Sequence, residues 1–278
     1  MEDYDYKMIV AGIGRYYDTI MHKCETWNSI SEICPVDFLT DERALTERHW
    51  HKELFVVLDL SDENSVDTAI KYNHIFHSAI KHFCSGFSAA IVSETQLSTA
   101  QNLLKDFDRV ILFHSPNDIF GFIEMMSLFN GRDGFIGMDL YDIYTNTKWK
   151  NGGYITKITF DNKKTAYEKI KNFAEKSSRF KISNENSKNA FVVLVTPMNI
   201  DLDDISSWVD TIYQNACIDY FLYQLYFNDN PDDKTITIYL LYGINNPDFG
   251  SDSDFFDPAC KDVQIINDLS ELFKKPSR

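Results

Sequence analysis

The sequence predicts an α/β protein with a Rossmann-like, doubly wound parallel sheet in its first half and a smaller α+β domain in its second half. Two observations support this prediction. Short apolar runs alternate with longer amphipathic segments in the first half, which is typical of parallel strands whose connecting helices cover both faces of a sheet. The rhythm then changes, and the last two strands follow each other directly. The expected units are residues 1–150, residues 151–243 and an acidic, flexible C-terminal tail at residues 244–278.

The first half contains five apolar runs that are expected to be strands, separated by amphipathic segments that are expected to be helices. The strands are predicted at residues 7–12, 36–39, 54–60, 87–92 and 109–113. The helices are predicted at residues 16–30, 66–84, 95–107 and 119–129, with a further one at 139–148. Either Asn64 or Ser65 is expected to cap the second helix. Right-handed crossovers would place such helices on both faces of the sheet.

The second half is expected to begin at a turn formed by Asn-Gly-Gly at residues 151–153. Strands are predicted at residues 154–160, 190–195, 220–227 and 235–242, and helices at residues 165–180 and 202–216. The turn-forming string Asn-Asp-Asn-Pro-Asp-Asp separates the last two strands and predicts that they form a hairpin.

The charge balance excludes several classes of function. Lys and Arg number 27 against 42 Asp and Glu, so the net charge is −15. Such a surface repels nucleic acids and anionic lipid headgroups. The five Cys are widely spaced without a Cys-x-x-Cys pair, and no apolar run reaches 18 residues. We therefore expect a cytoplasmic protein with reduced thiols and no direct membrane insertion.

Two strings near the N-terminus resemble motifs of the FtsZ/tubulin superfamily. Residues 9–14, Ile-Val-Ala-Gly-Ile-Gly, are similar to the glycine-rich turn after the first strand of FtsZ proteins. Residues 39–45, Leu-Thr-Asp-Glu-Arg-Ala-Leu, are similar to the family's Asn-Thr-Asp-x-x-Ala-Leu segment, with Leu39 in place of Asn.

Two later strings continue the resemblance in the same order. Residues 137–142, Gly-Met-Asp-Leu-Tyr-Asp, are similar to the Asn-x-Asp-Phe-x-Asp motif of the family's catalytic loop, with Gly137 in place of Asn. Residues 152–243 then resemble the family's C-terminal domain. The chain is thus similar to a shortened FtsZ-like protein over residues 6–243.

The resemblance implies where a nucleotide site would lie. In that family GTP sits on the N-terminal layer of one subunit, and acidic residues of the neighbouring subunit complete the site in a polarised filament. The implied nucleotide-binding residues are Gly12, Gly14, Arg15, Thr40 and Asp41. The implied catalytic residues are Asp139 and Asp142, acting on a neighbouring subunit. The alternative is that these two aspartates only cap the helix that begins near residue 140.

The family's phosphate-binding loop, a run such as Gly-Gly-Gly-Thr-Gly-Ser-Gly, has no equivalent here. The corresponding residues 59–68 contain no glycine and four carboxylates, Asp59, Asp62, Glu63 and Asp67. At ~4 Å and an effective dielectric constant near 20, each would repel a phosphate charge by about 4 kcal/mol. A micromolar affinity corresponds to about 8 kcal/mol, so two such pairs would cancel it. The carboxylates could hold a divalent cation, but we favour solvated helix caps.

Several histidines and the C-terminal tail have less specific patterns. His74, His77 and His82 lie on one predicted helix, but their angular spread does not suit a metal site, so structural or surface roles are expected and no metal is predicted. Residues 268–275 loosely resemble the tail peptide by which FtsZ docks onto division partners; alternatively they form a helix that folds back onto the domain.

These observations lead to one hypothesis and one alternative. The hypothesis is an FtsZ-like cytoskeletal or cell-division-associated protein with a degenerate nucleotide site, a pseudo-GTPase without a bound cofactor. It would act as a non-hydrolysing partner, cap or regulator of a filament, either of FtsZ or through self-association. The alternative is a divergent, filament-forming GTPase that binds GTP with Mg through Gly12, Gly14, Arg15 and Thr40.

Overall fold

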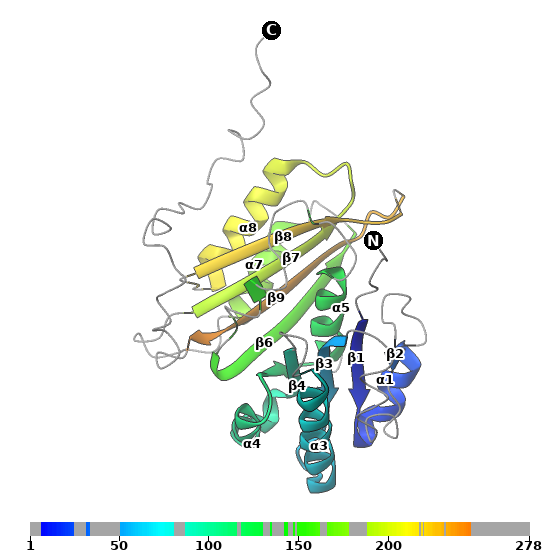
Figure 1. The fold of residues 1–278 in the computed structure, drawn as a ribbon. Coiled ribbons are helices and arrows are strands. Elements are labelled where there is room, and N and C mark those ends of the chain that lie inside the picture. The colour runs from blue at the N-terminus through cyan, green and yellow to red at the C-terminus, as the bar shows by residue number, and fades with distance from the viewer. Residues whose placement is uncertain are drawn as a thin grey trace.

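A nine-stranded sheet runs through the computed structural model of the chain (Figure 1), with strand order β2-β1-β3-β4-β5-β6-β9-β7-β8. The structure describes residues 7–24, 32–33, 51–80, 87–115, 118–129, 134, 142–143, 147, 149–161, 166–177, 188–216, 218, 220–230 and 232–245. This architecture confirms the predicted fold class, because a parallel sheet with helices is followed by a smaller α+β part.

The first half of the sheet is entirely parallel. Its strands are β1 (Lys7–Gly12), β2 (Glu32–Ile33), β3 (His51–Val57), β4 (Phe87–Ser93), β5 (Arg109–Phe113) and the start of β6 (Trp149–Phe160). Its helices are α1 (Tyr17–Cys24), α3 (Glu63–Ile80), α4 (Leu97–Ala100) and α5 (Ile119–Phe129), with short 3-10 turns η1 (Gly14–Tyr16), η3 (Glu94–Gln96) and η4 (Gln101–Lys105). The carboxyl ends of these strands therefore share one edge.

The second half joins the first through β6, which pairs parallel with β5 and antiparallel with β9 (Ile236–Asn245). Its other elements are α7 (Ala166–Ser177), β7 (Lys188–Thr196), α8 (Leu202–Ala216) and β8 (Tyr220–Phe227). The predicted boundary after residue 150 falls inside β6.

The predicted hairpin between the last two strands is wrong. β8 pairs parallel with β7, while β9 inserts between β6 and β7 and is antiparallel to both. The physical reason lies in β9 itself, whose residues from Ile236 to Tyr242 are almost all apolar and are buried in the core. Such a strand gains more from a central position with both faces covered than from an edge position beside β8.

The core forms two layers, one on each face of the sheet. Leu54 and Val56 of β3, and Leu58 directly after it, point to the face covered by α3, α4, α7 and α8. Phe55 and Val57 point to the opposite face, which α1 and α5 cover. Successive side chains of β3 thus point to alternate faces of the sheet, and both faces are buried. This is expected of a doubly wound sheet, whose helices cover both faces.

Other local predictions need correction. The predicted helix at residues 95–107 is broken into η3, α4 and η4. The predicted turn at residues 151–153 lies within β6, where the register shifts and Gly152 has a φ of +86°. The predicted strand at residues 36–39 lies outside the described residues, as does most of the predicted helix at 139–148. Within the described part, no helix is both long and apolar enough to cross a membrane.

Candidate functional site

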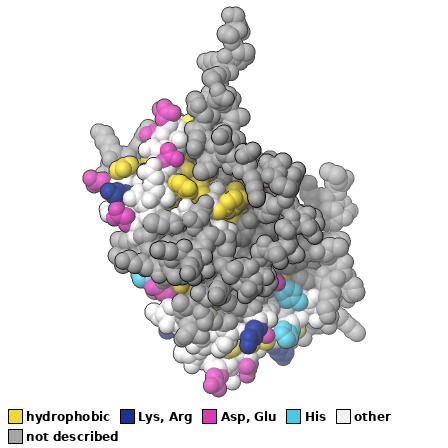
Figure 2. Space-filling model, turned by 90° about the vertical axis from the view of Figure 1, so that its left-hand side faces the viewer, with side chains coloured by type: hydrophobic (Ala, Val, Ile, Leu, Met, Phe, Trp, Pro, Cys, Tyr) yellow, Lys and Arg dark blue, Asp and Glu magenta, His cyan; other side chains and the backbone are white. Residues whose placement is uncertain are grey.

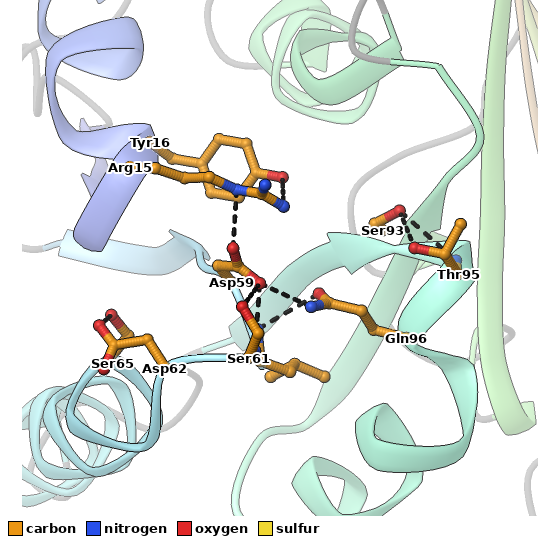
Figure 3. A network of polar contacts seen from close by, with 10 residues as sticks. Arg15, Tyr16, Asp59, Ser61, Asp62, Ser65, Ser93, Thr95 and Gln96 are labelled. Carbon is orange, nitrogen blue, oxygen red and sulfur yellow. Dashed lines mark hydrogen bonds and ion pairs between the residues drawn. The ribbon is translucent and has the colours of Figure 1, made fainter.

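The candidate site lies where the neighbouring strands β1, β3 and β4 end. In open α/β sheets, ligands bind at the carboxyl ends of parallel strands. A glycine turn follows β1, residues 58–62 link β3 to α3, and η3 follows β4. Backbone hydrogen bonds continue the sheet past the strand ends, from Ile13 N–H to Val57 at 2.9 Å and from Leu58 N–H to Ile91 at 3.2 Å. Three loops therefore meet at one place (Figure 3).

The glycine turn is packed against the first turn of α3. Gly14 has a φ of +64°, and a Cβ atom there would lie 2.8 Å from the hydroxyl oxygen of Ser65. A Cβ atom at Gly12 would lie 2.6 Å from the carbonyl oxygen of Tyr16. Both glycines are thus needed for the close approach of the chain to itself, whether or not a ligand binds.

Asp59 occupies the centre of the site. Its Oδ2 lies 2.8 Å from Nε of Arg15. Its Oδ1 accepts hydrogen bonds from the Ser61 backbone N–H (3.1 Å), the Ser61 hydroxyl (2.8 Å) and the side-chain amide of Gln96 (2.6 Å). Gln96 in turn accepts the backbone N–H of Leu60 at 3.2 Å. Figure 3 shows Arg15 reaching this carboxylate from above and Gln96 reaching it from the right.

These contacts stabilise the charged form of Asp59. Burial of the carboxylate, whose side chain is only 10% exposed, opposes its ionisation. The hydrogen bonds from Gln96 and Ser61, with the Arg15 guanidinium, outweigh that effect and hold the pKa of Asp59 below its ordinary value. Asp59 is thus a fixed anion in a place where a bound phosphate would bring its own negative charge.

The Asp62 side chain accepts one backbone N–H and one hydroxyl at the N-terminus of α3. Its Oδ1 accepts the backbone N–H of Asn64 at 3.1 Å, and its Oδ2 accepts the Ser65 hydroxyl at 2.6 Å. Asp62 is thus the N-cap residue, so the predicted cap at Asn64 or Ser65 is wrong by two or three positions. The preference for helix-capping carboxylates is confirmed for Asp62. An N-terminal N–H that could bind an external anion is already bonded to an internal one.

Arg15, a predicted nucleotide ligand, is directed at the protein. Besides its ion pair with Asp59, its Nη2 donates to the Tyr16 hydroxyl at 3.1 Å, and its guanidinium carbon lies 5.0 Å from the centre of the Tyr16 ring. The Arg15 side chain is still 61% exposed. An incoming anion would therefore have to compete with Asp59 for this cation.

The other predicted site residues are not all placed. Thr40, Asp41 and Asp139 lie outside the described residues. Asp142 is half-buried and precedes Ile143, which is buried in the core layer under α1 and α5. Among the described residues, no group of three or more His, Cys, Asp or Glu is arranged to hold a metal ion.

Sequence reasoning missed Gln96 and Ser61, which hold Asp59 in place. Ser61 follows Asp59 closely and could have been proposed as a local hydrogen-bond partner. Gln96 comes from the next strand's loop, and nothing in its sequence context distinguishes it from an ordinary polar helix residue. Only the pairing of β3 with β4 brings it to Asp59.

Comparisons with solved structures identify the fold. A mutant FtsZ from M. jannaschii is 15% identical, with 74% of this chain and 68% of that chain covered and a TM-score of 0.50. The GDP-bound monomer of CetZ1 from Haloferax volcanii is 12% identical, with 87% and 95% covered and a TM-score of 0.52. No family model and no curated protein sequence matches the chain. The chain has the fold of the FtsZ/tubulin superfamily.

Proposed function

We propose that this chain is an FtsZ/tubulin-like cytoskeletal protein that does not hydrolyse GTP and that acts in the cytoplasm as a partner, cap or regulator of a filament. The fold supports the cytoskeletal part of the proposal. The contacts of Asp59 and Asp62 at the strand ends support the absence of GTP hydrolysis, because these carboxylates place negative charge where the phosphates of a nucleotide would lie.

One observation carries the proposal: the groups that would bind a phosphate are already bonded to carboxylates of the protein itself. A phosphate needs free backbone N–H groups at a helix N-terminus and a cation directed at it. At α3 the Asp62 carboxylate accepts an N-terminal N–H, and at the glycine turn the Arg15 guanidinium is paired with Asp59. Binding of GTP would require breaking both contacts and then placing phosphates beside two carboxylates.

The divergent GTPase remains the alternative, and one observation favours it. Arg15 is well exposed despite its ion pair, and exposed ion pairs contribute at most about 1 kcal/mol. Arg15 could therefore turn from Asp59 to a phosphate at low cost, with the glycine turn beside it. Saturable binding of GTP with Mg would support this alternative over the proposal.

In the proposal, the loop with Asp139 and Asp142 faces a partner. This loop would dock on the nucleotide-bearing surface of an FtsZ subunit or of a second copy. The strand-end surface with Asp59 and Asp62 would not accept a further nucleotide-dependent contact. A molecule with one competent end and one inactive end would stop filament growth.

The experiment mixes the purified protein with a polymerising FtsZ and measures filament length and GTP turnover. We expect shorter filaments at substoichiometric amounts, and a loss of this effect in the double variant Asp139→Asn/Asp142→Asn. The double variant Glu63→Gln/Asp67→Asn, which removes two exposed carboxylate charges from α3, serves as a charge-matched control. Unchanged filaments and turnover would count against the proposal, and light scattering of the protein alone would then test nucleotide-free self-association.

A further inference from the structure

The strand β8 forms one edge of the sheet (Figure 1), because within the part of the chain that the structure describes it pairs with β7 alone. The opposite edge is β2, a strand of two residues that includes the charged Glu32. β8 differs in both respects, since it has eight residues and none of them is charged. The two edges of the sheet are therefore protected to different degrees.

Natural sheets protect their edges with short strands, charged side chains, proline or bulges, because an open edge pairs readily with another strand. β8 contains no proline and no charge, and its register with β7 runs without a shift from Tyr220 to Phe227. The strand thus lacks all four devices, in a chain whose net charge is −15. An uncharged edge in so acidic a protein indicates a surface that another strand can approach.

The first half of β8 carries the exposed apolar surface. Tyr220 is 40% exposed, and Phe221, Leu222 and Tyr223 are half-buried, whereas the next three residues are buried. Phe221 and Tyr223 point to the face that α8 covers, and Leu222 points to the opposite face. Apolar surface is therefore accessible on both faces of one short stretch, residues 220–223.

The α8 side of this stretch is formed by aromatic rings with a carboxylate beside them. The ring of Phe221 lies 6.1 Å from that of Tyr213 in α8 and 6.1 Å from that of Tyr223. Asp210 is exposed on α8. Burial, with a contribution from the charge of Asp210, raises the pKa of Tyr223 above its ordinary value. Asp210 therefore lies close enough to Tyr223 to act electrostatically on this edge.

We propose that β8 pairs with β8 of a second copy of this chain, antiparallel and about a two-fold axis at Leu222. In this register Leu222 lies opposite Leu222 of the second copy, and Phe221 lies opposite the second copy's Tyr223. Opposed residues of an antiparallel pair point to the same face, so the half-buried side chains of the two copies cover one another. The contact closes after two copies and does not propagate.

The absence of charge is what selects a second copy as the occupant. Two identical uncharged strands meet without placing like charges opposite each other. A basic peptide would need carboxylates opposite its own cations, and β8 contains none. Over the rest of the surface the net charge of −15 opposes the approach of an identical molecule. The β8 edge therefore offers two copies a place to meet at the lowest electrostatic cost.

This pairing goes beyond the proposed function and does not depend on it. The contact uses the side of the sheet, whereas the proposed filament contacts use the carboxyl ends of the strands and the loop with Asp139 and Asp142. A closed pair of copies also differs from a filament, which grows without limit. Either proposal can fail while the other holds.

Sedimentation velocity of the full chain without nucleotide tests the pairing, and we expect a monomer–dimer equilibrium at micromolar concentration with no larger species. Leu222→Lys places two ammonium groups opposite each other at the axis and should raise the dimer dissociation constant at least about tenfold. The matched control is Met198→Lys. It adds the same charge at a side chain that is 66% exposed in the loop after β7, and it should leave the dissociation constant within about twofold.

Asp210 gives a second test with the opposite sign. The two-fold axis brings the Asp210 carboxylates of both copies to the same face of the joined sheet, where they repel each other and salt screens the repulsion. Asp210→Asn should therefore lower the dissociation constant by about twofold to threefold in 20 mM NaCl and by less in 300 mM NaCl. Asp67→Asn, which removes an equally exposed charge from α3, is the control and should have a smaller effect.

Three outcomes would overturn the proposal. One is a chain that stays monomeric, even with residues 220–224 protected from hydrogen exchange, since another segment of the chain would then cover β8. Another is a dimer that neither Leu222→Lys nor Asp210→Asn alters. The last is open aggregation without a dimer. Because Asp210 is exposed, Asp210→Asn keeps the test decisive if Leu222→Lys fails to fold.

Discussion

At the scale of single residues, the ion pair between Asp59 and Arg15 decides how the candidate site would meet an anion. The sequence suggested that Arg15 could meet an anion, and it does, but the anion belongs to the protein. Nothing local to Arg15 or Asp59 predicts their contact, because it arises only when β1 pairs with β3. The sequence drew attention to Arg15 and to Asp59 separately, and it did not predict that they would pair with each other.

Replacement of Asp59 by Asn should lower the free energy of unfolding by about 1 to 3 kcal/mol at pH 7, the usual range for a hydrogen-bonded charged group. Because the folded pKa of Asp59 is lowered, its contribution is present above the unfolded pKa and is lost as the pH falls through the folded pKa. Urea unfolding at pH 7 and pH 3 measures this. The difference in the free energy of unfolding between wild type and Asp59→Asn should be smaller at pH 3 than at pH 7, and a constant difference would contradict the assignment. The exposed Asp67→Asn should leave the free energy of unfolding at pH 7 almost unchanged.

Replacement of Gly14 by Ala should cost about 1 to 2 kcal/mol for the left-handed backbone, with an added steric cost against Ser65. Thermal unfolding of Gly14→Ala, Ser65→Ala and Gly14→Ala/Ser65→Ala separates the two contributions, because the Ser65→Ala variant alone measures the loss of the hydrogen bond to Asp62. The double variant should recover only the steric part. Full stability in the single variant would mean that the turn has another conformation.

At the scale of elements, the predictions succeeded where periodicity is strong and failed where pairing is long-range. The apolar runs of β1, β3, β4 and β5 identified the parallel strands, because a buried strand has little freedom in composition. The turn residues between β8 and β9 are compatible both with a hairpin and with the observed insertion of β9, so the local sequence could not exclude a hairpin. The insertion of β9 depends on two partner strands that lie far away in the sequence.

The irregular start of β6 gives the sharpest test of packing. A Cβ atom at Gly153 would lie 1.9 Å from the Trp149 ring, and one at Gly243 in β9 would lie 2.2 Å from it. Gly153→Ala should therefore destabilise the fold by about 1 to 3 kcal/mol through overpacking and shift the Trp149 fluorescence. Gly121→Ala on α5 is the control, since its nearest contact would be an ordinary 3.4 Å. A neutral Gly153→Ala would contradict the packing described here.

At the scale of the whole molecule, the net charge of −15 bears on assembly. On the face drawn in Figure 2, acidic side chains occur in both the upper and the lower part. Repulsion between copies should weaken any self-association at low ionic strength, and salt should relieve it. Sedimentation velocity without nucleotide is expected to show a larger associated fraction in 300 mM than in 20 mM NaCl. An opposite salt dependence would indicate that ion pairs hold the copies together.

If the carboxylates of Asp59 and Asp62 occupy the groups that would bind phosphate, the purified protein should not bind GTP, and calorimetric titration with GTP and Mg tests this most directly. The matched variant Asp59→Asn/Asp62→Ser shows whether the carboxylates are responsible for any lack of binding. We expect no saturable heat for the wild type up to millimolar GTP. Saturable binding at micromolar concentration would contradict the claim and would favour the divergent GTPase.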